Sequence, residues 1–456
     1  MSILIKNVLL GGRGAGRERD IFIEGNLIEE VSEAGAGGLK EREAEFVLDG
    51  RGKAAIPGLF NAHTHAAMTL FRGYADDLPL QEWLETKIWP AEARLTEEDV
   101  YWGTRLACLE MIKSGTTFFN DMYWHWRGSA RAVAESGMRA ALSAVFIDGF
   151  DETRAREQQK RNEALYRESK KFPERIIFAL GPHAIYTVSE ESLCWVRDFS
   201  EKHDLLVHIH LSETAGEVEE CVKRCGGGEG GGGRGGRGGR GGRGGKRPVE
   251  FLDGLGFLSP RTVACHCVHL SRREVELLKK NEVKIVHSPA SNMKLSAGRL
   301  PYEELKRAGL YENIALGTDG CASNNNLDLF EEMKIASLFQ KAFGSPTSLP
   351  AEEAFGLATR NAARMFRLNA GAVEEGRLAD VALLDLKKAE LVPSHNLISN
   401  IVYAANGSCV DTLICDGRIL MKGGKVEGEE EVKEKAGEVA RELVRREKRG
   451  VRRREE

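Results

Sequence analysis

An eightfold alternation of strand and helix patterns constrains this chain more than any other feature. From about residue 54 to residue 345, short apolar, β-branched runs alternate with longer amphipathic stretches. The eight candidate strands end near Phe60, Asn120, Phe146, Gly181, His210, His266, His287 and Thr318. The strands are continuously apolar, as expected where both faces of a parallel sheet are covered. Eight strands that alternate with helices predict a (β/α)8 TIM barrel.

Several helical patterns between these strands begin after a residue that can cap a helix. The clearest predicted helices are Glu97–Lys113, Glu190–Lys202, Arg272–Lys280 and Tyr302–Ala308. Thr96, Ser189 and Ser271 precede the first three, and a hydroxyl there accepts a hydrogen bond from the first helical turn. We therefore expect these three helices to start where the sequence indicates.

The two ends of the chain carry short strand patterns joined by glycine-rich turns. The predicted strands are Ile3–Leu10, Asp20–Ile23, Leu27–Val31, Phe46–Leu48, Asp380–Asp385, Thr412–Cys415 and Arg418–Met421. Neither end would bury much apolar surface alone. We therefore expect residues 1–53 and 368–427 to form one small β-sandwich beside the barrel of residues 54–367. Residues 428–456, rich in Glu, Lys and Arg, predict a charged surface helix with a solvated tail.

The composition is that of an ordinary globular protein. The 456 residues are 42% hydrophobic and 29% charged, with a formal net charge of −4. This balance gives no general attraction to nucleic acids or anionic membranes, and no apolar run approaches the roughly 18–20 residues that span a bilayer. The N-terminus lacks the apolar core and cleavage site of a signal peptide. We therefore expect a cytoplasmic protein without a membrane segment.

One segment departs from the barrel pattern. Residues 226–245 contain fifteen glycines and four Arg-Gly-Gly units, after the helix that follows the fifth strand. Such a sequence cannot offset the entropy of folding, so we expect a disordered surface insertion. Arg-Gly-Gly tracts can follow the phosphates of RNA, but no aromatic residue here could stack on bases, so nucleic-acid binding is not expected.

The nine cysteines indicate free thiols, because an odd number in a large protein without an export signal argues against a disulfide framework. Cys265-His266-Cys267 could suggest a metal cluster. Residues that alternate along a strand cannot all face one ion, however. We expect Cys265 and Cys267 to be buried packing residues.

Metal-competent residues follow the predicted strand ends. His63 and His65 come after the first strand, and their two-residue spacing in extended backbone places both imidazoles on one face. His210 closes the fifth strand, His266 closes the sixth, and Asp319 follows the eighth. Active sites of barrels are built at these C-terminal strand ends. Imidazoles with a carboxylate suit Zn²⁺ or Fe²⁺ better than Mg²⁺ or Ca²⁺, and such an ion can supply hydroxide at neutral pH.

A second carboxylate, Glu213, lies three residues after His210. So close to the ion, it could shuttle protons to a substrate; the alternative is a helix glutamate favoured by the helix dipole. The His-Glu-x-x-His and the His-x-Glu with Cys-x-x-Cys signatures of other zinc hydrolases are absent. The fourth strand ends in Gly181-Pro182-His183 rather than in the bridging lysine of two-metal barrel hydrolases, so we expect one metal ion.

Longer motifs are spread almost end to end along the chain. They include Pro57-Gly-Leu-Phe-Asn-Ala-His63-Thr-His65, Trp89-Pro-Ala-Glu92, His208-Ile-His210-Leu-Ser-Glu213, His266-Cys-Val-His269 and Gly317-Thr-Asp319-Gly-Cys-Ala-Ser-Asn-Asn-Asn326. Together they resemble the amidohydrolase superfamily, and within it the methylthioadenosine/S-adenosylhomocysteine deaminase family. The His-x-His pair is shared across the superfamily, whereas the Trp-Pro-x-Glu and Thr-Asp-Gly runs are narrower. The archaeal 5′-deoxyadenosine deaminase branch is the most similar.

The resemblance implies a reaction and a role for each residue. The ligands of one divalent ion per subunit, zinc before Fe²⁺ or Mn²⁺, would be His63, His65, His210 and Asp319. Activated water would attack C6 of adenine, with Asp319 taking its proton, Glu213 protonating N1 and His266 bonding the attacking oxygen. Glu92 would bind the ribose hydroxyls, and His183 would contact the nucleoside. The products would be an inosine analogue and ammonia. The resemblance also implies a homo-oligomer, namely a tetramer.

One departure from relatives bears on the 5′ group of the substrate. Some relatives hold the homocysteine carboxylate with an arginine at the position of Ala144. Arg154 or Arg156 could supply a charge from the following loop. The loss favours an uncharged 5′ group, as in 5′-deoxyadenosine, methylthioadenosine or adenosine, over S-adenosylhomocysteine. Deamination of another aminated heterocycle, of the guanine or triazine type, is the alternative function, because such enzymes share the metal site and differ in the sugar pocket.

Overall fold

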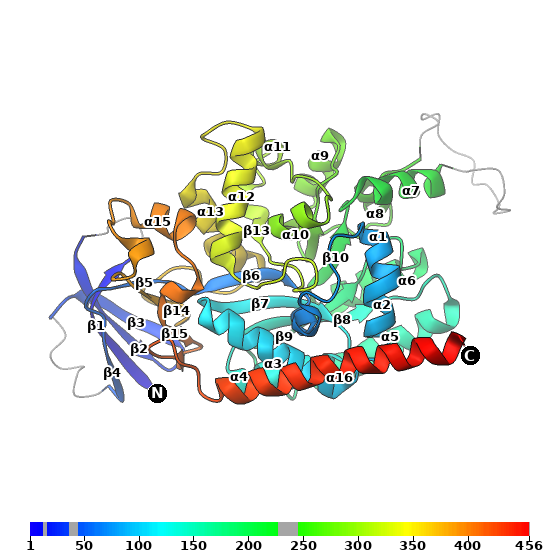
Figure 1. Ribbon diagram of the computed structural model, residues 1–456. Coiled ribbons are helices and arrows are strands. Elements are labelled where there is room, and N and C mark those ends of the chain that lie inside the picture. The colour runs from blue at the N-terminus through cyan, green and yellow to red at the C-terminus, as the bar shows by residue number, and fades with distance from the viewer. Residues whose placement is uncertain (12–15, 36–43, 227–244, 456) are drawn as a thin grey trace.

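The expected barrel is present as one parallel sheet (Figure 1). The computed structural model describes residues 1–11, 16–35, 44–226 and 245–455, with side chains as far as residue 446. In order around the sheet, the strands are β6 (Leu59–Thr64), β7 (Thr116–Tyr123), β8 (Arg139–Phe146), β9 (Ile176–Pro182), β10 (Val207–Leu211), β11 (Thr262–His266), β12 (Lys284–His287) and β13 (Ile314–Leu316). All eight predicted strands are confirmed.

The last strand, β13, returns to the first, β6, and closes the barrel. The backbone N–H of Asp319 donates to the carbonyl oxygen of His63 over 3.0 Å. Asn61 spans the same seam, because its Nδ2 donates to Thr318 Oγ1 (2.7 Å) and its Oδ1 accepts from the Thr318 N–H (3.0 Å). His63 and Asp319, which lie more than 250 residues apart in sequence, are therefore neighbours.

Strand β6 runs further than the apolar pattern indicated. Its expected end was near Phe60, whereas the strand continues to Thr64, which pairs with Asp121 of β7. The Thr64 hydroxyl lies 3.1 Å from Asp121 Oδ1 and 3.0 Å from the Asn120 carbonyl oxygen. Polar residues can extend a buried strand where such partners satisfy them. The apolar run alone could not reveal those partners.

Helices cover the outside of the barrel (Figure 1). Between β6 and β9 the chain forms η2 (Ala66–Phe71), α1 (Leu80–Trp83), η3 (Leu84–Ile88), α2 (Trp89–Glu92), α3 (Glu97–Lys113), α4 (Trp126–Ser136) and α5 (Glu152–Ser169). The middle of the chain contributes α6 (Glu190–His203), α7 (Ala215–Cys225), α8 (Pro248–Gly254), α9 (Arg272–Lys280), α10 (Pro289–Lys294), α11 (Tyr302–Arg307) and η4 (Tyr311–Asn313). The remainder are α12 (Leu329–Phe343), α13 (Ala351–Leu357), α14 (Arg360–Met365), η5 (Ala389–Leu391), α15 (Leu397–Tyr403), η6 (Gly407–Cys409) and α16 (Glu429–Glu455).

The predicted helix starts are confirmed. The four predicted helices correspond to α3, α6, α9 and α11 to within one residue. The hydroxyls of Thr96, Ser189 and Ser271 each accept a hydrogen bond from the backbone N–H of the third helical residue. Capping is a local interaction, which is why the sequence could indicate it.

Both ends of the chain combine, as expected, and they form one mixed sheet where a small β-sandwich was predicted. Its strand order is β16 (Arg418–Met421), β15 (Val410–Cys415), β14 (Val381–Asp385), β5 (Lys53–Pro57), β1 (Ser2–Leu10), β2 (Glu18–Glu24) and β3 (Leu27–Glu33), with β4 (Phe46–Asp49) paired to β1. Strand β5 was not predicted here, because its apolar run leads directly into β6 and suggested the start of the barrel at residue 54. It pairs instead with β14 and β1.

Apolar side chains fill the barrel away from the polar strand ends. Phe118 packs against Phe60 and Phe366, with ring centroids 5.0 and 4.5 Å apart. Cys265 belongs to this inner cluster, and Cys267 to the larger cluster that includes the surrounding helices. Both are completely buried, as predicted, and all nine cysteines are free thiols. The carboxyl ends of the strands are thus left for polar residues.

Two further expectations concern the insertion and the chain end. The glycine- and arginine-rich segment predicted at residues 226–245 falls on residues 227–244, which lie outside the described residues. The charged C-terminal helix is present as α16, and three of its apolar side chains are buried: Val432, Ala436 and Leu443. None of the helices in the described ranges is long and apolar enough to cross a membrane.

Candidate active site

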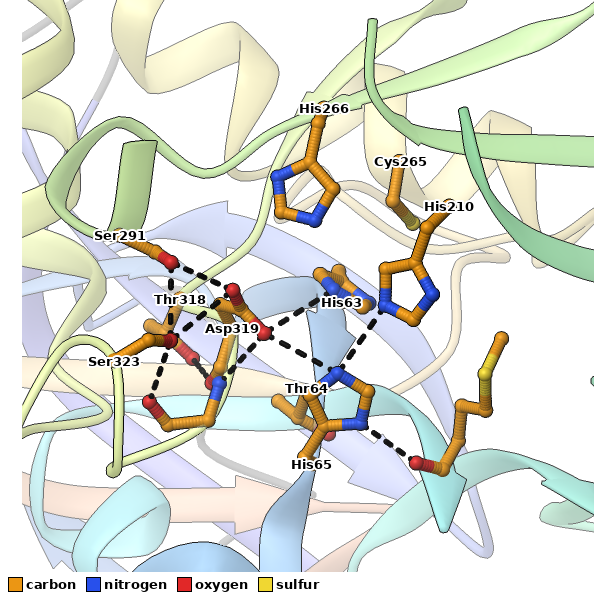
Figure 2. Close-up of polar contacts among 12 residues, drawn as sticks. His63, Thr64, His65, His210, Cys265, His266, Ser291, Thr318, Asp319 and Ser323 are labelled. Carbon is orange, nitrogen blue, oxygen red and sulfur yellow. Dashed lines mark hydrogen bonds and ion pairs between the residues drawn. The ribbon is translucent and has the colours of Figure 1, made fainter. Parts of the chain in front are cut away.

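The metal-competent residues meet at the carboxyl ends of the barrel strands (Figure 2). The five are His63 near the end of β6, His65 directly after it, His210 on β10, His266 at the end of β11, and Asp319 after β13. His65 is partly buried and the other four are buried. Their side chains point toward a common centre. The convergence that the sequence indicated is present in the fold.

Three distances define the centre of this cluster. Asp319 Oδ1 lies 3.3 Å from His63 Nε2 and 3.3 Å from His65 Nε2. The Nε2 atoms of His65 and His210 are also 3.3 Å apart. Two ligand atoms that are each about 2.1 Å from one zinc ion, at a tetrahedral angle, lie about 3.4 Å from each other. The spacing of these four side chains therefore fits a single metal ion.

The hydrogen bonds of two histidines determine where their lone pairs point. Nδ1 of His65 lies 2.7 Å from the Met122 carbonyl oxygen, and Nδ1 of His210 lies 2.8 Å from that of His183. A carbonyl only accepts, so each Nδ1 carries the hydrogen and each Nε2 presents a lone pair. The two lone pairs face each other across 3.3 Å, an arrangement that a cation between them stabilises.

His208 orients the imidazole of His63. Nδ1 of His63 lies 2.8 Å from His208 Nε2, while His63 Nε2 is buried without a hydrogen-bond partner among the described residues. Burial lowers the pKa of His208 well below its usual range, so its neutral ring accepts from His63. Cys265 Sγ lies 3.1 Å from the same Nε2. No role was predicted for His208, although it precedes His210 by two residues and shares its face of β10.

Asp319 is held in one orientation by its neighbours. Its Oδ2 accepts hydrogen bonds from Ser291 Oγ (2.7 Å) and Ser323 Oγ (3.2 Å), and its Oδ1 accepts from the Gly320 N–H (2.8 Å). Its backbone has φ +64°, a strained conformation for a residue other than glycine. Burial alone would raise the pKa of Asp319, but the adjacent histidines hold it well below its usual range. The carboxylate is therefore charged and oriented toward the cluster centre.

Glu213 and His266 lie next to each other on the same rim. His266 Nε2 is 3.9 Å from Glu213 Oε2, and His266 Nδ1 is 2.8 Å from Asn292 Oδ1. Burial raises the pKa of Glu213, which favours a carboxyl that keeps its proton. Glu217 fixes the turn, because its carboxylate accepts from the backbone N–H groups of Ser212 (2.9 Å) and Glu213 (2.8 Å). A carboxyl with a raised pKa and a hydrogen-bonding imidazole thus border the ligand cluster.

A cavity opens above the cluster and contains both predicted nucleoside contacts. Glu92 and His183 line it together with His65, Glu213 and Asp319. Its aromatic lining, none of it assigned a role from the sequence, comprises Trp83, Trp89, Tyr123, Trp124 and Tyr186. Only the closeness of Trp83 and Trp89 in sequence could have suggested part of it. Aromatic rings of this kind can stack on a planar base.

Glu92 and His183 are each oriented by a neighbour. Glu92 is partly buried, and its Oε2 accepts a hydrogen bond from Trp124 Nε1 over 3.1 Å. His183 Nδ1 lies 2.9 Å from the Thr187 hydroxyl oxygen. The Tyr123 side chain also lies beside the Glu92 carboxyl.

The structure changes the reason for expecting an uncharged 5′ group. Ala144 packs in the cluster between strands and helices, whereas Val145 and Ile147 line the cavity. Arg154 and Arg156 are exposed, and Arg156 pairs with a glutamate on its own helix. Among the described residues that line the cavity there is no lysine or arginine. The absence of a lysine or arginine to pair with a carboxylate is a property of the whole described lining and not of position 144 alone.

Comparisons with known proteins agree with this geometry. The model of the amidohydrolase family matches residues 54–420. The chain is 50% identical over 450 residues to the 5′-deoxyadenosine deaminase of Methanoregula boonei, covering 98% of this chain and 96% of that protein. It is 47% identical over 448 residues to 5-methylthioadenosine/S-adenosylhomocysteine deaminase 1 of Archaeoglobus fulgidus, covering 97% and 99%. A zinc-bound adenosine deaminase from Xanthomonas campestris has a similar structure, with a TM-score of 0.86, 32% identity and coverage of 97% and 98%.

Proposed function

The chain belongs to the amidohydrolase family, and we propose that it is a zinc-dependent deaminase with 5′-deoxyadenosine as its preferred substrate. Its reaction is the hydrolytic deamination of 5′-modified adenosines to the inosine analogues and ammonia. The observation that carries the proposal is the pair of imidazole lone pairs on His65 and His210, which face each other 3.3 Å apart beside Asp319. The cavity above them also contains Glu92.

The proposed ligands of the ion are His63, His65, His210 and Asp319. When bound, zinc lowers the pKa of a water molecule to about 7, so that hydroxide is available near neutral pH. Asp319 takes the proton of the attacking water, since its carboxylate is charged and held by two serine hydroxyls. Glu213 gives a proton to N1 of adenine, and His266 donates a hydrogen bond to the attacking oxygen at C6. Asp319 then passes its proton to the amino group at C6, which leaves as ammonia when the ring regains its planarity, and the proton left on the C6 oxygen replaces the one that Glu213 gave.

The cavity also supports the proposed substrate. Glu92 accepts hydrogen bonds from the ribose hydroxyls with its carboxylate, which Trp124 orients. His183 contacts the nucleoside, and the aromatic rings enclose the base. Without a lysine or arginine in the described lining, no residue would pair with the carboxylate of S-adenosylhomocysteine. An uncharged 5′ group is therefore favoured, as in 5′-deoxyadenosine, methylthioadenosine or adenosine.

A panel of substrates tests the proposed function. We expect zinc-loaded protein to convert 5′-deoxyadenosine with the highest kcat/KM, followed by methylthioadenosine and adenosine, and S-adenosylhomocysteine at least about tenfold less well, because one charged hydrogen-bonding partner is missing. The change in ultraviolet absorbance from adenine to hypoxanthine measures each rate. Guanine is included as a free base. No turnover of any adenine nucleoside would overturn the proposal, and turnover of guanine alone would favour the alternative heterocycle deaminase.

Glu92→Ala separates a nucleoside enzyme from a free-base enzyme. We expect kcat/KM for 5′-deoxyadenosine to fall about 10–100-fold, because each lost hydrogen bond to a charged group contributes about 1.5–3 kcal/mol. Metal content should stay the same, since Glu92 is not a proposed ligand. The exposed neighbour Ala93 offers a control in Ala93→Ser, which should be neutral. An unchanged kcat/KM in Glu92→Ala would refute the role of Glu92 in binding ribose.

A further inference from the structure

The C-terminal helix α16 lies along one side of the barrel and reaches the segment that carries Glu92 (Figure 1). Its main packing partner is α3, and it also contacts η2 and α2. The segment formed by α1, η3 and α2 connects β6 to α3 and forms one side of the cavity. A residue far along the chain can therefore influence the position of this segment.

Apolar contacts join α16 to the lining of the cavity. Ala436 and Leu443 of α16 are each 1% exposed and belong to one buried cluster with Trp83, Leu84 and Ile88. Trp83 and Leu84 belong to the cavity lining as well. One buried cluster thus includes side chains of α16 and side chains that line the cavity.

Arg446 adds a polar connection directly beside Glu92. Its guanidinium donates two hydrogen bonds to the Asp99 carboxylate, over 2.8 Å and 3.0 Å. It also donates to the backbone carbonyl of Arg94 over 3.3 Å, and Arg94 in turn donates to the backbone carbonyl of Arg446. Asp99 is 7% exposed, and it also caps the start of α3 through Thr96. Arg94, which Arg446 contacts, is two residues after Glu92 in the sequence.

The segment needs such support because its own secondary structure is short. The helices α1 and α2 have four residues each, and η3 between them is a π-type turn of five. Helices of this length are not stable by themselves and depend on packing. Trp124 orients the carboxylate of Glu92, but it does not hold the backbone of α2. The contacts from α16 add to that restraint, beside His125, whose Nε2 lies 2.9 Å from the Leu95 carbonyl oxygen in the following turn.

We propose that α16 determines the position of Glu92, and so the affinity for the ribose, with Arg446 as the positioning residue. Arg446 does not line the cavity and touches no reacting atom. It acts by holding Arg94, in the turn between α2 and α3, and Asp99, in the first turn of α3. This inference rests on the proposed function, because it assumes that Glu92 binds the ribose hydroxyls.

Arg446→Met tests the proposal with two substrates. We expect KM for 5′-deoxyadenosine to rise about tenfold, with kcat changed less than about twofold, because a small displacement weakens an oriented hydrogen bond. KM for 2′,3′-dideoxyadenosine, which lacks the ribose hydroxyls, should not change. In the Glu92→Ala background, Arg446→Met should have no further effect on KM, since both changes remove one interaction. The control is Arg445→Met, whose side chain is 69% exposed.

The outcomes separate failure of this inference from failure of the proposed function. If KM rises equally for both substrates, or if the effects of Glu92→Ala and Arg446→Met on KM multiply, the role of α16 in positioning Glu92 is refuted. An unchanged KM in Arg446→Met also refutes it, while activity of the parent protein leaves the proposed function intact. If Arg446→Met does not fold, Leu443→Ala is measured with the same two substrates and the same expected difference. Metal content and melting temperature are measured for each variant.

Discussion

His65→Ala is expected to lose the bound metal ion and at least about 10⁴-fold of kcat/KM for 5′-deoxyadenosine, or about 5.5 kcal/mol of transition-state stabilisation. The Nε2 atom of His65 lies 3.3 Å from both Asp319 Oδ1 and His210 Nε2, so it occupies the middle of the proposed ligand set. Removing it leaves three of the four proposed ligands without the one that lies between His210 and Asp319, which weakens metal binding and with it the lowering of the pKa of water. Elemental analysis of the purified variant and steady-state kinetics measure the two effects.

The same experiment identifies the metal and contains its own control. His395 is exposed and distant in sequence from every ligand, so His395→Ala should keep both metal and activity. Parent protein treated with a chelator should lose activity to a similar extent, and added zinc should restore it more fully than Fe²⁺ or Mn²⁺. A His65→Ala variant that retained stoichiometric metal and ordinary kcat would contradict the proposed site.

Glu213→Gln is expected to lower kcat by about 10²–10⁴-fold while the metal content stays unchanged. Burial raises the pKa of Glu213, so the native side chain can hold the proton that N1 of adenine must receive. Glutamine has the same size and can donate a hydrogen bond, but it cannot transfer a proton. The loss should therefore appear in kcat more than in KM.

Glu220→Gln is the matched control, because Glu220 is exposed on the same turn-and-helix segment. It should leave kcat within about twofold of the parent, as surface substitutions usually have small effects. If Glu213→Gln kept a kcat within about tenfold of the parent, N1 would receive its proton from another group. Loss of metal from Glu213→Gln would mean that Glu213 is a ligand, which the proposed set of four does not include.

The sequence predicted the elements of the barrel because their signals are local. Apolar runs and helical periodicity depend on residues a few positions apart, and the caps at Thr96, Ser189 and Ser271 involve only the next helical turn. The signals failed where two elements share one apolar run. Strand β5 was therefore assigned to the barrel, although hydrogen bonds to β14 and β1 place it in the mixed sheet.

The positions of the five polar residues at strand ends were also readable from the sequence, since the carboxyl ends of parallel strands must meet on one rim. Which atoms face each other was decided only by the tertiary structure. The seam between β6 and β13 brings His63 next to Asp319, and His208 orients His63. Ala144 is not among the residues that line the cavity. Such relations depend on side chains packed from segments hundreds of residues apart, and no periodicity within one segment encodes them. The sequence alone determined which residues can bind a metal. Closure of the barrel decided that their side chains meet at one centre.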